Sequence, residues 1–211
     1  AMILSETRNI ARSHMALKNG EWRLEYPNTR TTVKEMHDLT VGIVGYGSIG
    51  RLVAFKLSNF GCKILVSDPF LKECKESYAT LVPFDELLQQ SDIVSLHARS
   101  NGAIMTEREF CLMKQDSYLI NSARSYLVET EAFKNAMDSG KLLGAAIDVF
   151  ETEPDIPEFY LTYDNITLTN HLGGITINSF RDAPGYAMKN YLGYLRGESE
   201  LMFWVNKNKL A

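Results

Sequence analysis

The sequence predicts an α/β fold in which helices cover both faces of a doubly wound parallel sheet. Short apolar runs alternate with segments of helical periodicity between residues 40 and 168, a pattern typical of strands joined by crossover helices. A G-x-G-x-x-G motif links the first run to the first of these helices. The composition, 45% hydrophobic and 23% charged over 211 residues, is that of a globular chain with a buried core and one or two domains.

The individual elements follow from hydrophobic spacing and from local turn signals. Apolar residues from Met2 to Leu17 have helical spacing and predict one helix that Gly20 ends, and the polar residues 21–38 predict a loop. Strands are predicted at Thr40–Val44, Lys63–Ser67, Ile93–Leu96, Tyr118–Ile120, Ala145–Val149 and Ile166–Leu168. Helices are predicted at Ile49–Asn59, Phe84–Gln90, Glu107–Met113, from about Glu131 to Ser139 and from about Tyr186 to Arg196.

Some of these helices have recognisable ends. Thr106 and Glu109 predict a capping box before the third helix, and Gly140 ends the fourth. Pro184 is expected only at the start of the last helix, because a proline deeper inside a helix costs about 3 kcal/mol. Strands and helices that alternate in this way imply right-handed crossovers and a sheet that is covered on both faces.

Charge and cysteine content exclude several classes of protein. The 22 Lys and Arg residues against 26 Asp and Glu residues give a net charge of -4, which argues against nucleic acid or an anionic membrane as partner. Cys62, Cys74 and Cys111 fit neither a disulfide framework nor a zinc site, so no metal is expected and a reducing compartment is. With no apolar stretch of membrane-spanning length and no secretion signal near Ala1, the prediction is a cytoplasmic protein.

The motif Gly45-Tyr46-Gly47-Ser48-Ile49-Gly50 predicts a dinucleotide site in a Rossmann-type fold. Gly45 would allow the sharp turn after the strand, Gly47 would let a pyrophosphate approach, and Gly50 would let the helix pack close to the strand. The amides at the helix start, at Ser48 and Ile49, would then face the phosphates, where the helix dipole also favours an anion.

Asp68 predicts which dinucleotide binds. It ends the second strand 18 residues after Gly50, where a carboxylate can accept hydrogen bonds from the adenosine ribose and would repel a 2′-phosphate. This favours NAD over NADP, although Lys72 and Lys75 could offer charge to the phosphate form. The alternative is that Asp68-Pro69 is a plain turn.

Three further segments each end a predicted strand and bring Arg124, Asp148, Glu153 and His171 to the edge where ligands bind in open α/β sheets. Such a set suits proton and hydride transfer. Taken singly, each residue could equally be a solvated or ion-paired loop residue. His97, after the strand at Ile93–Leu96, is expected to be a structural contact beside the adenine pocket.

With these motifs in place, the chain from about Asp38 to its C-terminus resembles the NAD-dependent D-2-hydroxyacid dehydrogenase family, of the phosphoglycerate dehydrogenase-like type. The resemblance implies NAD as cofactor and a 2-hydroxy or 2-oxo acid as substrate. It also implies that Arg124 holds the substrate's carboxylate and carbonyl oxygen, that His171 is the general acid or base, and that Glu153 pairs with the imidazole. Asp148 would face the nicotinamide. The predicted cofactor contacts are Gly45, Gly47, Ser48, Ile49, Gly50, Asp68, Ala98, Ala123, Asp148 and His171.

The chain departs from the family pattern in three places. Ala98-Arg99 stands where many relatives have proline, Ser125-Tyr126 follows the arginine in place of glycine, and Asn170 stands where proline usually precedes the histidine. Arg99 and Tyr126 are expected to reshape the pocket toward a more polar acid. An alternative function is a non-catalytic NAD-sensing protein of the corepressor type, and another Rossmann dehydrogenase would require a different catalytic set.

The family also carries a further half-domain before the motif, so we expect a truncated chain with the nucleotide domain only, able to bind NAD but poor or inactive as a dehydrogenase. The predicted divisions are an inter-domain helix and linker at 1–37, an NAD-binding domain with the catalytic residues at 38–183, and a C-terminal helix and tail at 184–211. We expect an exposed apolar side of Met2, Ile3, Leu4 and Ile10 to bind a second copy of the chain, giving a homodimer.

Overall fold

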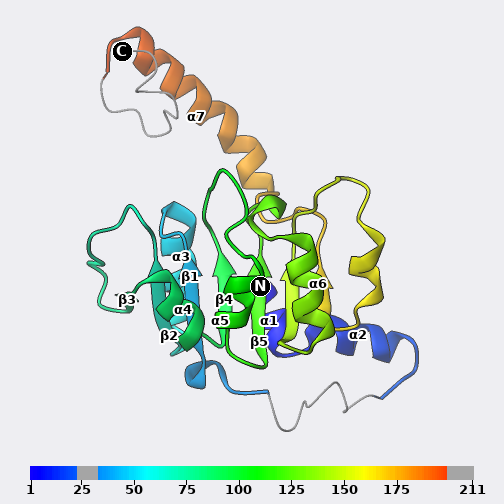
Figure 1. Ribbon diagram of the computed structural model, residues 1–211. Coiled ribbons are helices and arrows are strands. Elements are labelled where there is room, and N and C mark those ends of the chain that lie inside the picture. Colours follow the sequence, from blue (N-terminus) through cyan, green and yellow to red (C-terminus); the bar gives the residue numbers. More distant parts are fainter. Residues whose placement is uncertain (23–32, 199–211) are drawn as a thin grey trace. The chain divides into compact units, whose positions relative to one another are not determined.

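The computed structural model describes residues 1–22 and 33–198, in two compact units (Figure 1). The first unit is Ala1–Asn170 and the second begins at His171. The predicted divisions at 37/38 and 183/184 stay predictions. Pro27 and Asn28 of the predicted loop, and residues 199–211 of the predicted tail, lie outside the described residues.

The first unit is built on a seven-stranded sheet in the order β3-β2-β1-β4-β5-β6-β7, with every neighbouring pair parallel. The strands are β1 (Thr40–Val44), β2 (Lys63–Ser67), β3 (Ala79–Leu81), β4 (Ile93–Leu96), β5 (Ser117–Asn121), β6 (Leu142–Ile147) and β7 (Ile166–Leu168). The order reverses between β1 and β4, as in the predicted doubly wound Rossmann-type fold, which is confirmed.

Helices cover both faces of the sheet (Figure 1). One core lies under α4 (Phe84–Gln90), α5 (Glu107–Leu112) and α6 (Thr130–Asp138), and the other lies under α1 (Met2–Thr7) and α3 (Ser48–Ser58). Consecutive strand residues alternate between the two cores: Val41 and Ile43 face the second, while Val44 faces the first. Short 3-10 helices lie at Met36–Asp38, Ser125–Leu127 and Glu158–Thr162.

The predicted helix ends are present at α5 and α6. Glu109 Oε2 accepts hydrogen bonds from the Thr106 amide at 3.1 Å and from the Thr106 hydroxyl at 2.5 Å, which confirms the capping box. Gly140 follows α6 with a φ of 68°, a left-handed conformation that glycine adopts without steric cost.

The first predicted helix is wrong as a single element. It is two helices, α1 and α2 (Ile10–Lys18), separated at Asn9, which has a left-handed φ of 54°. Asparagine tolerates this conformation better than most residues. Its side-chain oxygen also accepts a hydrogen bond from Arg12 Nε at 3.0 Å, so the break is held by a local side-chain contact that hydrophobic spacing does not reveal.

The expected exposed apolar side at the start of the chain is also wrong for most of its residues. Ile3 is 6% exposed, and Met2 and Leu4 pack against the same core beside it. The helix α1 contacts β5, β6 and β7, so Ile3 is buried, and Met2 and Leu4 partly buried, against the chain's own sheet. Of the four residues named, only Ile10 is exposed, at 55%.

The second unit contains α7 (Ile177–Leu195), with Pro184 in its interior. The predicted start near Tyr186 is therefore wrong. The helix begins earlier because Thr176 Oγ1 accepts a hydrogen bond from the Ser179 amide at 3.0 Å, and Ser179 Oγ accepts one from the Thr176 amide at 3.1 Å. This capping box nucleates the helix ahead of the proline.

Across the described residues, 1–22 and 33–198, no helix is both long and apolar enough to span a bilayer. Within the same ranges, no group of three or more His, Cys, Asp or Glu side chains is arranged to hold a metal ion.

Candidate functional site at the carboxyl edge of the sheet

The turn after β1 brings the chain against the end of β4, where the strand order reverses. Gly45 has a φ of 90°, and a Cβ at this position would lie 2.6 Å from the Ala98 nitrogen and 2.7 Å from the His97 carbonyl carbon. No other residue could adopt this turn without moving the backbone of His97 and Ala98, which follow β4. The Gly45 amide donates to the Ser67 carbonyl at 2.9 Å, which also ties the turn to β2.

The next residues form the start of α3, with Gly47 as its N-cap. A Cβ at Gly50 would lie 2.2 Å from the Gly45 carbonyl oxygen, whereas a Cβ at Gly47 would meet nothing within 4 Å. Gly50 is thus required for the close approach of helix and turn, while Gly47 leaves open space in front of the first amides of α3, at Ser48 and Ile49. Helix amides in that position lack partners inside the helix and bind anions. The residues present fit a dinucleotide pyrophosphate.

Asp68, at the end of β2, contacts the same turn. Its Oδ2 accepts a hydrogen bond from the Tyr46 amide at 2.8 Å, and its Oδ1 accepts one from the Phe70 amide at 2.9 Å. The carboxylate therefore forms the local turn and also orders the glycine motif. It lines an open cavity of about 630 Å³, a size usual for small-molecule sites. The residues around this cavity are Ser67, Asp68, Pro69, Leu71, Leu81, Val82, Pro83 and Phe84.

His97 follows β4 and continues its pairing with β1, since its amide donates to the Val44 carbonyl at 2.7 Å. Its Nε2 lies 2.9 Å from the Ser95 hydroxyl. Burial lowers the pKa of His97 to about 4, because the charged imidazolium is poorly solvated there. The ring is therefore neutral at pH 7.

Arg124 lies on the loop after β5, and a buried side chain holds that loop. Asn121, 2% exposed, accepts a hydrogen bond from the Ala123 amide at 3.1 Å and donates one to the Arg124 carbonyl at 2.9 Å. The Arg124 side chain is exposed, and its guanidinium donates to the Ala123 carbonyl at 2.6 Å. Sequence reasoning gave Asn121 no role; the available signal was a polar side chain placed directly at a buried strand end.

Asp148 lies after β6, next to the Arg124 loop. It is 1% exposed, its amide donates to the Asn121 carbonyl at 3.0 Å, and its Oδ1 accepts a hydrogen bond from the Thr169 hydroxyl at 2.5 Å. Thr169 therefore fixes the orientation of this buried carboxylate from the end of β7. The role of Thr169 was also missed by sequence analysis, because threonine is common in strands and gives no signal by itself.

Glu153 lies in the exposed loop that follows Asp148. Its Oε1 accepts a hydrogen bond from the Phe150 amide at 3.0 Å, which closes a short turn. Glu151 has a different role, since its Oε1 accepts hydrogen bonds from the Thr130 hydroxyl at 2.9 Å and the Tyr160 hydroxyl at 3.5 Å. The loop that carries Glu153 is thereby attached to α6 and to the aromatic core beneath it.

His171 is the first residue of the second unit and has a left-handed φ of 56°. The structure thus brings Gly45, Asp68, Ala98, Arg124 and Asp148 to one edge of one sheet. The convergence of His171 with Arg124 and Glu153 stays a prediction.

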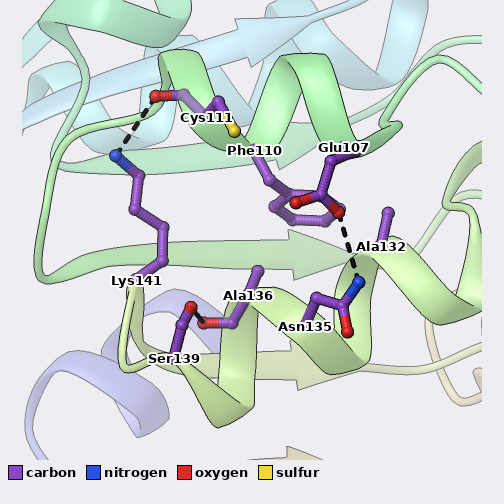
Figure 2. A pocket seen from close by; sticks show the side chains of 8 residues that line it. All are labelled: Glu107, Phe110, Cys111, Ala132, Asn135, Ala136, Ser139 and Lys141. Atoms are coloured by element: carbon purple, nitrogen blue, oxygen red, sulfur yellow. Dashed lines mark hydrogen bonds between the residues drawn. The ribbon is translucent and has the colours of Figure 1, made fainter.

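A second, smaller cavity of about 210 Å³ lies between α5 and α6 (Figure 2). Glu107 Oε2 accepts a hydrogen bond from Asn135 at 3.4 Å, and Lys141 Nζ donates to the Cys111 carbonyl at 3.2 Å. The lining of this cavity comes from α5, α6 and the residues that follow α6, and includes none of the predicted site residues.

Comparison with known proteins gives the same picture as the geometry. The family model of the D-isomer specific 2-hydroxyacid dehydrogenase, NAD binding domain, matches residues 1–173. A glyoxylate reductase of Thermofilum pendens is 36% identical over 207 residues, which are 93% of this chain and 60% of that protein. The chain thus spans about 60% of the length of this curated relative.

Solved structures are similar over the same extent. A glyoxylate reductase from Paecilomyes thermophila has a TM-score of 0.85 at 29% identity, covering 98% of this chain and 63% of that one. A D-lactate dehydrogenase from Aquifex aeolicus, complexed with NAD and lactic acid, has a TM-score of 0.80 at 29% identity, covering 95% of this chain and 66% of that one.

Proposed function

The chain belongs to the D-isomer specific 2-hydroxyacid dehydrogenase family through its NAD-binding domain, and on that premise we propose that it interconverts a 2-hydroxy acid and the corresponding 2-oxo acid with NAD. When bound, the cofactor would accept the hydride as NAD⁺ or supply it as NADH. The observation that carries the proposal is the shared edge of the sheet: the open space at Gly47, the Asp68 carboxylate and the Arg124 loop all follow carboxyl ends of parallel strands.

Arg124 is the proposed substrate-binding residue. A guanidinium donates two parallel hydrogen bonds to a planar carboxylate, which fixes the position of the neighbouring α-carbon. Its position is supported by Asn121, which holds the carbonyl of Arg124 and the amide of Ala123. In the reducing direction the same positive charge stabilises the oxygen that becomes negative, so it favours the transition state over the ground state.

His171 is the proposed general acid or base, and Glu153 its partner. The ordinary pKa of histidine, about 6.5, allows proton exchange near neutral pH. A neighbouring carboxylate favours the imidazolium and selects the ring tautomer. In the reducing direction His171 gives its proton to the carbonyl oxygen of the substrate. Asp148 would face the nicotinamide, with its carboxylate oriented by Thr169.

We also propose NAD in preference to NADP, a homodimer, and a cytoplasmic location. Asp68 supports the first, since its charge would repel a 2′-phosphate. Apolar side chains on α2 support the second: Ile10, Met15 and Leu17 are 55%, 58% and 54% exposed. Three free cysteine thiols support a reducing compartment. Sedimentation that gives only monomer would contradict the dimer.

The test combines dinucleotide titration with turnover. NAD and NADP are titrated calorimetrically, and a panel of 2-oxo acids is then screened with NADH for wild type, His171→Ala and the control His14→Ala on α2. We expect NAD to bind all three proteins, and any turnover that wild type shows to be lost in His171→Ala and kept in His14→Ala. Binding of NAD with no turnover by wild type would fit the expected truncated chain or the NAD-sensing alternative, and preference for NADP would contradict the role given to Asp68.

A further inference from the structure

An arginine lies on the helix that begins at the proposed pyrophosphate site. Arg51 belongs to the first turns of α3, and its amide donates to the Gly47 carbonyl at 3.0 Å. Its guanidinium carbon lies 4.6 Å from the centroid of the Tyr46 ring, a cation–π contact. The Tyr46 amide also donates a hydrogen bond to Asp68, the carboxylate that we assign to the ribose. Tyr46 therefore contacts both Arg51 and Asp68.

Glu76 holds this arginine in place. It forms an ion pair and hydrogen bond with Arg51, and its Oε2 accepts a hydrogen bond from the Cys74 thiol at 3.3 Å. The side chain of Glu76 is 24% exposed. Partial burial raises its pKa, but hydrogen bonds from its own amide and from Cys74, together with the charge of Arg51, outweigh burial and hold that pKa below its ordinary value.

A positive charge near the N-terminus of a helix is unfavourable unless an anion compensates it, because the helix dipole is positive at that end. An anionic partner therefore stabilises Arg51, and Glu76 is such a partner in this structure. A guanidinium is also the side chain best suited to bind a phosphate with two hydrogen bonds. Glu76 and a phosphate group on the adenosine ribose would therefore compete for the same cation.

We propose that Glu76 is a second determinant of cofactor choice, which disfavours NADP by keeping Arg51 bound against Tyr46. This inference rests on the preference for NAD proposed above. Asp68 acts by repelling a 2′-phosphate, whereas Glu76 acts by withholding the cation that would attract one. Asp68 and Glu76 flank residues 69–75 in the sequence. Asp68 accepts a hydrogen bond from the Tyr46 amide, and Glu76 pairs with Arg51, whose guanidinium lies over the Tyr46 ring.

The chain offers a matched control for this idea. Glu73 lies in the same loop and pairs with Lys75 at 3.7 Å, with both side chains largely exposed at 72% and 82%. Glu73→Gln and Glu76→Gln remove the same charge from the same loop, but only the second releases Arg51. Glu73→Gln releases Lys75, whose exposed pair with Glu73 is weak, so its loss is expected to change NADP binding little. A difference between the two variants therefore reports the specific pair and not the general field of the loop.

The experiment measures dissociation constants for NAD and NADP by calorimetry with wild type, Glu73→Gln, Glu76→Gln and the double variant Arg51→Gln/Glu76→Gln. We expect Glu76→Gln to strengthen NADP binding about tenfold, the size of one charge-assisted contact, with NAD binding unchanged within about twofold. NADP should still bind more weakly than NAD, because Asp68 remains. The double variant and Glu73→Gln should have the wild-type ratio of the NADP dissociation constant to the NAD dissociation constant.

Three results would overturn the inference: an unchanged ratio in Glu76→Gln, an equal rise in Glu73→Gln, or a gain that persists in the double variant. If wild type binds NAD but the ratio does not respond, only this inference fails. If wild type binds neither dinucleotide, the proposed function fails with it. Should Glu76→Gln not fold, Arg51→Gln alone gives a second measurement, since NADP binding that falls in Arg51→Gln would mean that Arg51 already binds the phosphate and is not withheld.

Discussion

Gly47 and Gly50 lie in the same turn but are glycine for different reasons. We expect Gly47 to serve ligand binding and Gly50 to serve folding. A Cβ at Gly47 would meet no atom within 4 Å, whereas one at Gly50 would lie 2.2 Å from a backbone oxygen. We expect Gly47→Ala to leave the free energy of unfolding nearly unchanged and to weaken NAD binding at least tenfold, since the methyl group would occupy the space of the pyrophosphate.

Gly50→Ala is the matched comparison and should lower the free energy of unfolding by about 2 kcal/mol or more, because the helix must move away from the turn. Urea unfolding and calorimetric titration of both variants check the pair. Equal losses of stability in the two variants would mean that the space at Gly47 serves the fold and not a ligand.

His97 gives the protein a pH dependence of stability. Burial lowers its pKa to about 4 in the folded state, against about 6.5 in the unfolded chain. The unfolded state therefore binds more protons between these values, and stability is lost as pH falls from about 6.5 toward 4. We expect a loss of about 2 kcal/mol between pH 7 and pH 5 from this residue.

Urea unfolding at the two pH values, with wild type and His97→Gln, measures that contribution. His14→Gln, at an exposed position of α2, is the control. The variant at position 97 should lose about 2 kcal/mol less than wild type on acidification, and the control should behave as wild type. The same pH dependence in all three proteins would show that His97 is not the group responsible.

At the scale of elements, the docking of α1 depends on a buried acid. Glu6 is 0% exposed; its two carboxylate oxygens accept hydrogen bonds from Arg12 at 2.8 Å and from Thr167 on β7 at 2.7 Å. Burial raises the pKa of Glu6, and the charge of Arg12 opposes that rise. We expect Glu6→Ala to lower the free energy of unfolding by about 3 to 5 kcal/mol, because it breaks an ion pair in a nearly buried site.

Thr167→Val provides a graded comparison, since it removes one hydrogen bond and keeps the ion pair. It should cost about 1 kcal/mol. Denaturant unfolding of both variants gives the two values. A cost for Glu6→Ala no larger than that for Thr167→Val would mean that α1 is held by the packing of Ile3 alone.

The sequence predicted strands better than it predicted the breaks in helices. Strands such as Thr40–Val44 and Lys63–Ser67 have the predicted bounds, because they are buried on both faces and read as continuous apolar runs. The edge strand β3 was not predicted, because its three residues are half-exposed or exposed and are too few to show a hydrophobic pattern. Asn9 and the Thr176 capping box act through local side-chain hydrogen bonds, which periodicity does not detect.

The same limit applies to the candidate site. The glycine motif and Asp68 were predictable because their spacing follows from the geometry of one turn and two adjacent strands. Asn121 and Thr169 were not, because what makes them important is the partner that the fold brings to them, the Arg124 loop in one case and Asp148 in the other. The roles of Arg124, Glu153 and His171 came from the family resemblance and stay predictions.

For the whole molecule, ligand binding should be visible as stability. A ligand that binds only the folded state adds about 2.7 kcal/mol to the free energy of unfolding at one hundred times its dissociation constant. We expect NAD at that excess to raise the unfolding midpoint of wild type. Gly47→Ala at the same NAD concentration should show about half that rise or less, and the control without NAD should show none. A midpoint that does not respond to NAD would contradict the site at the carboxyl edge.

The contact between Glu6 and Thr167 joins residues 161 positions apart, and this bears on how the chain folds as it is synthesised. The helix α1 leaves the ribosome long before β5, β6 and β7, against which it packs. Until those strands emerge, Ile3 is not covered by the sheet, and Glu6 lacks the hydrogen bond from Thr167. Contacts between such distant residues form slowly, so the far half of the sheet closes late, and chaperones that bind short apolar segments have their opportunity while those strands are still being synthesised.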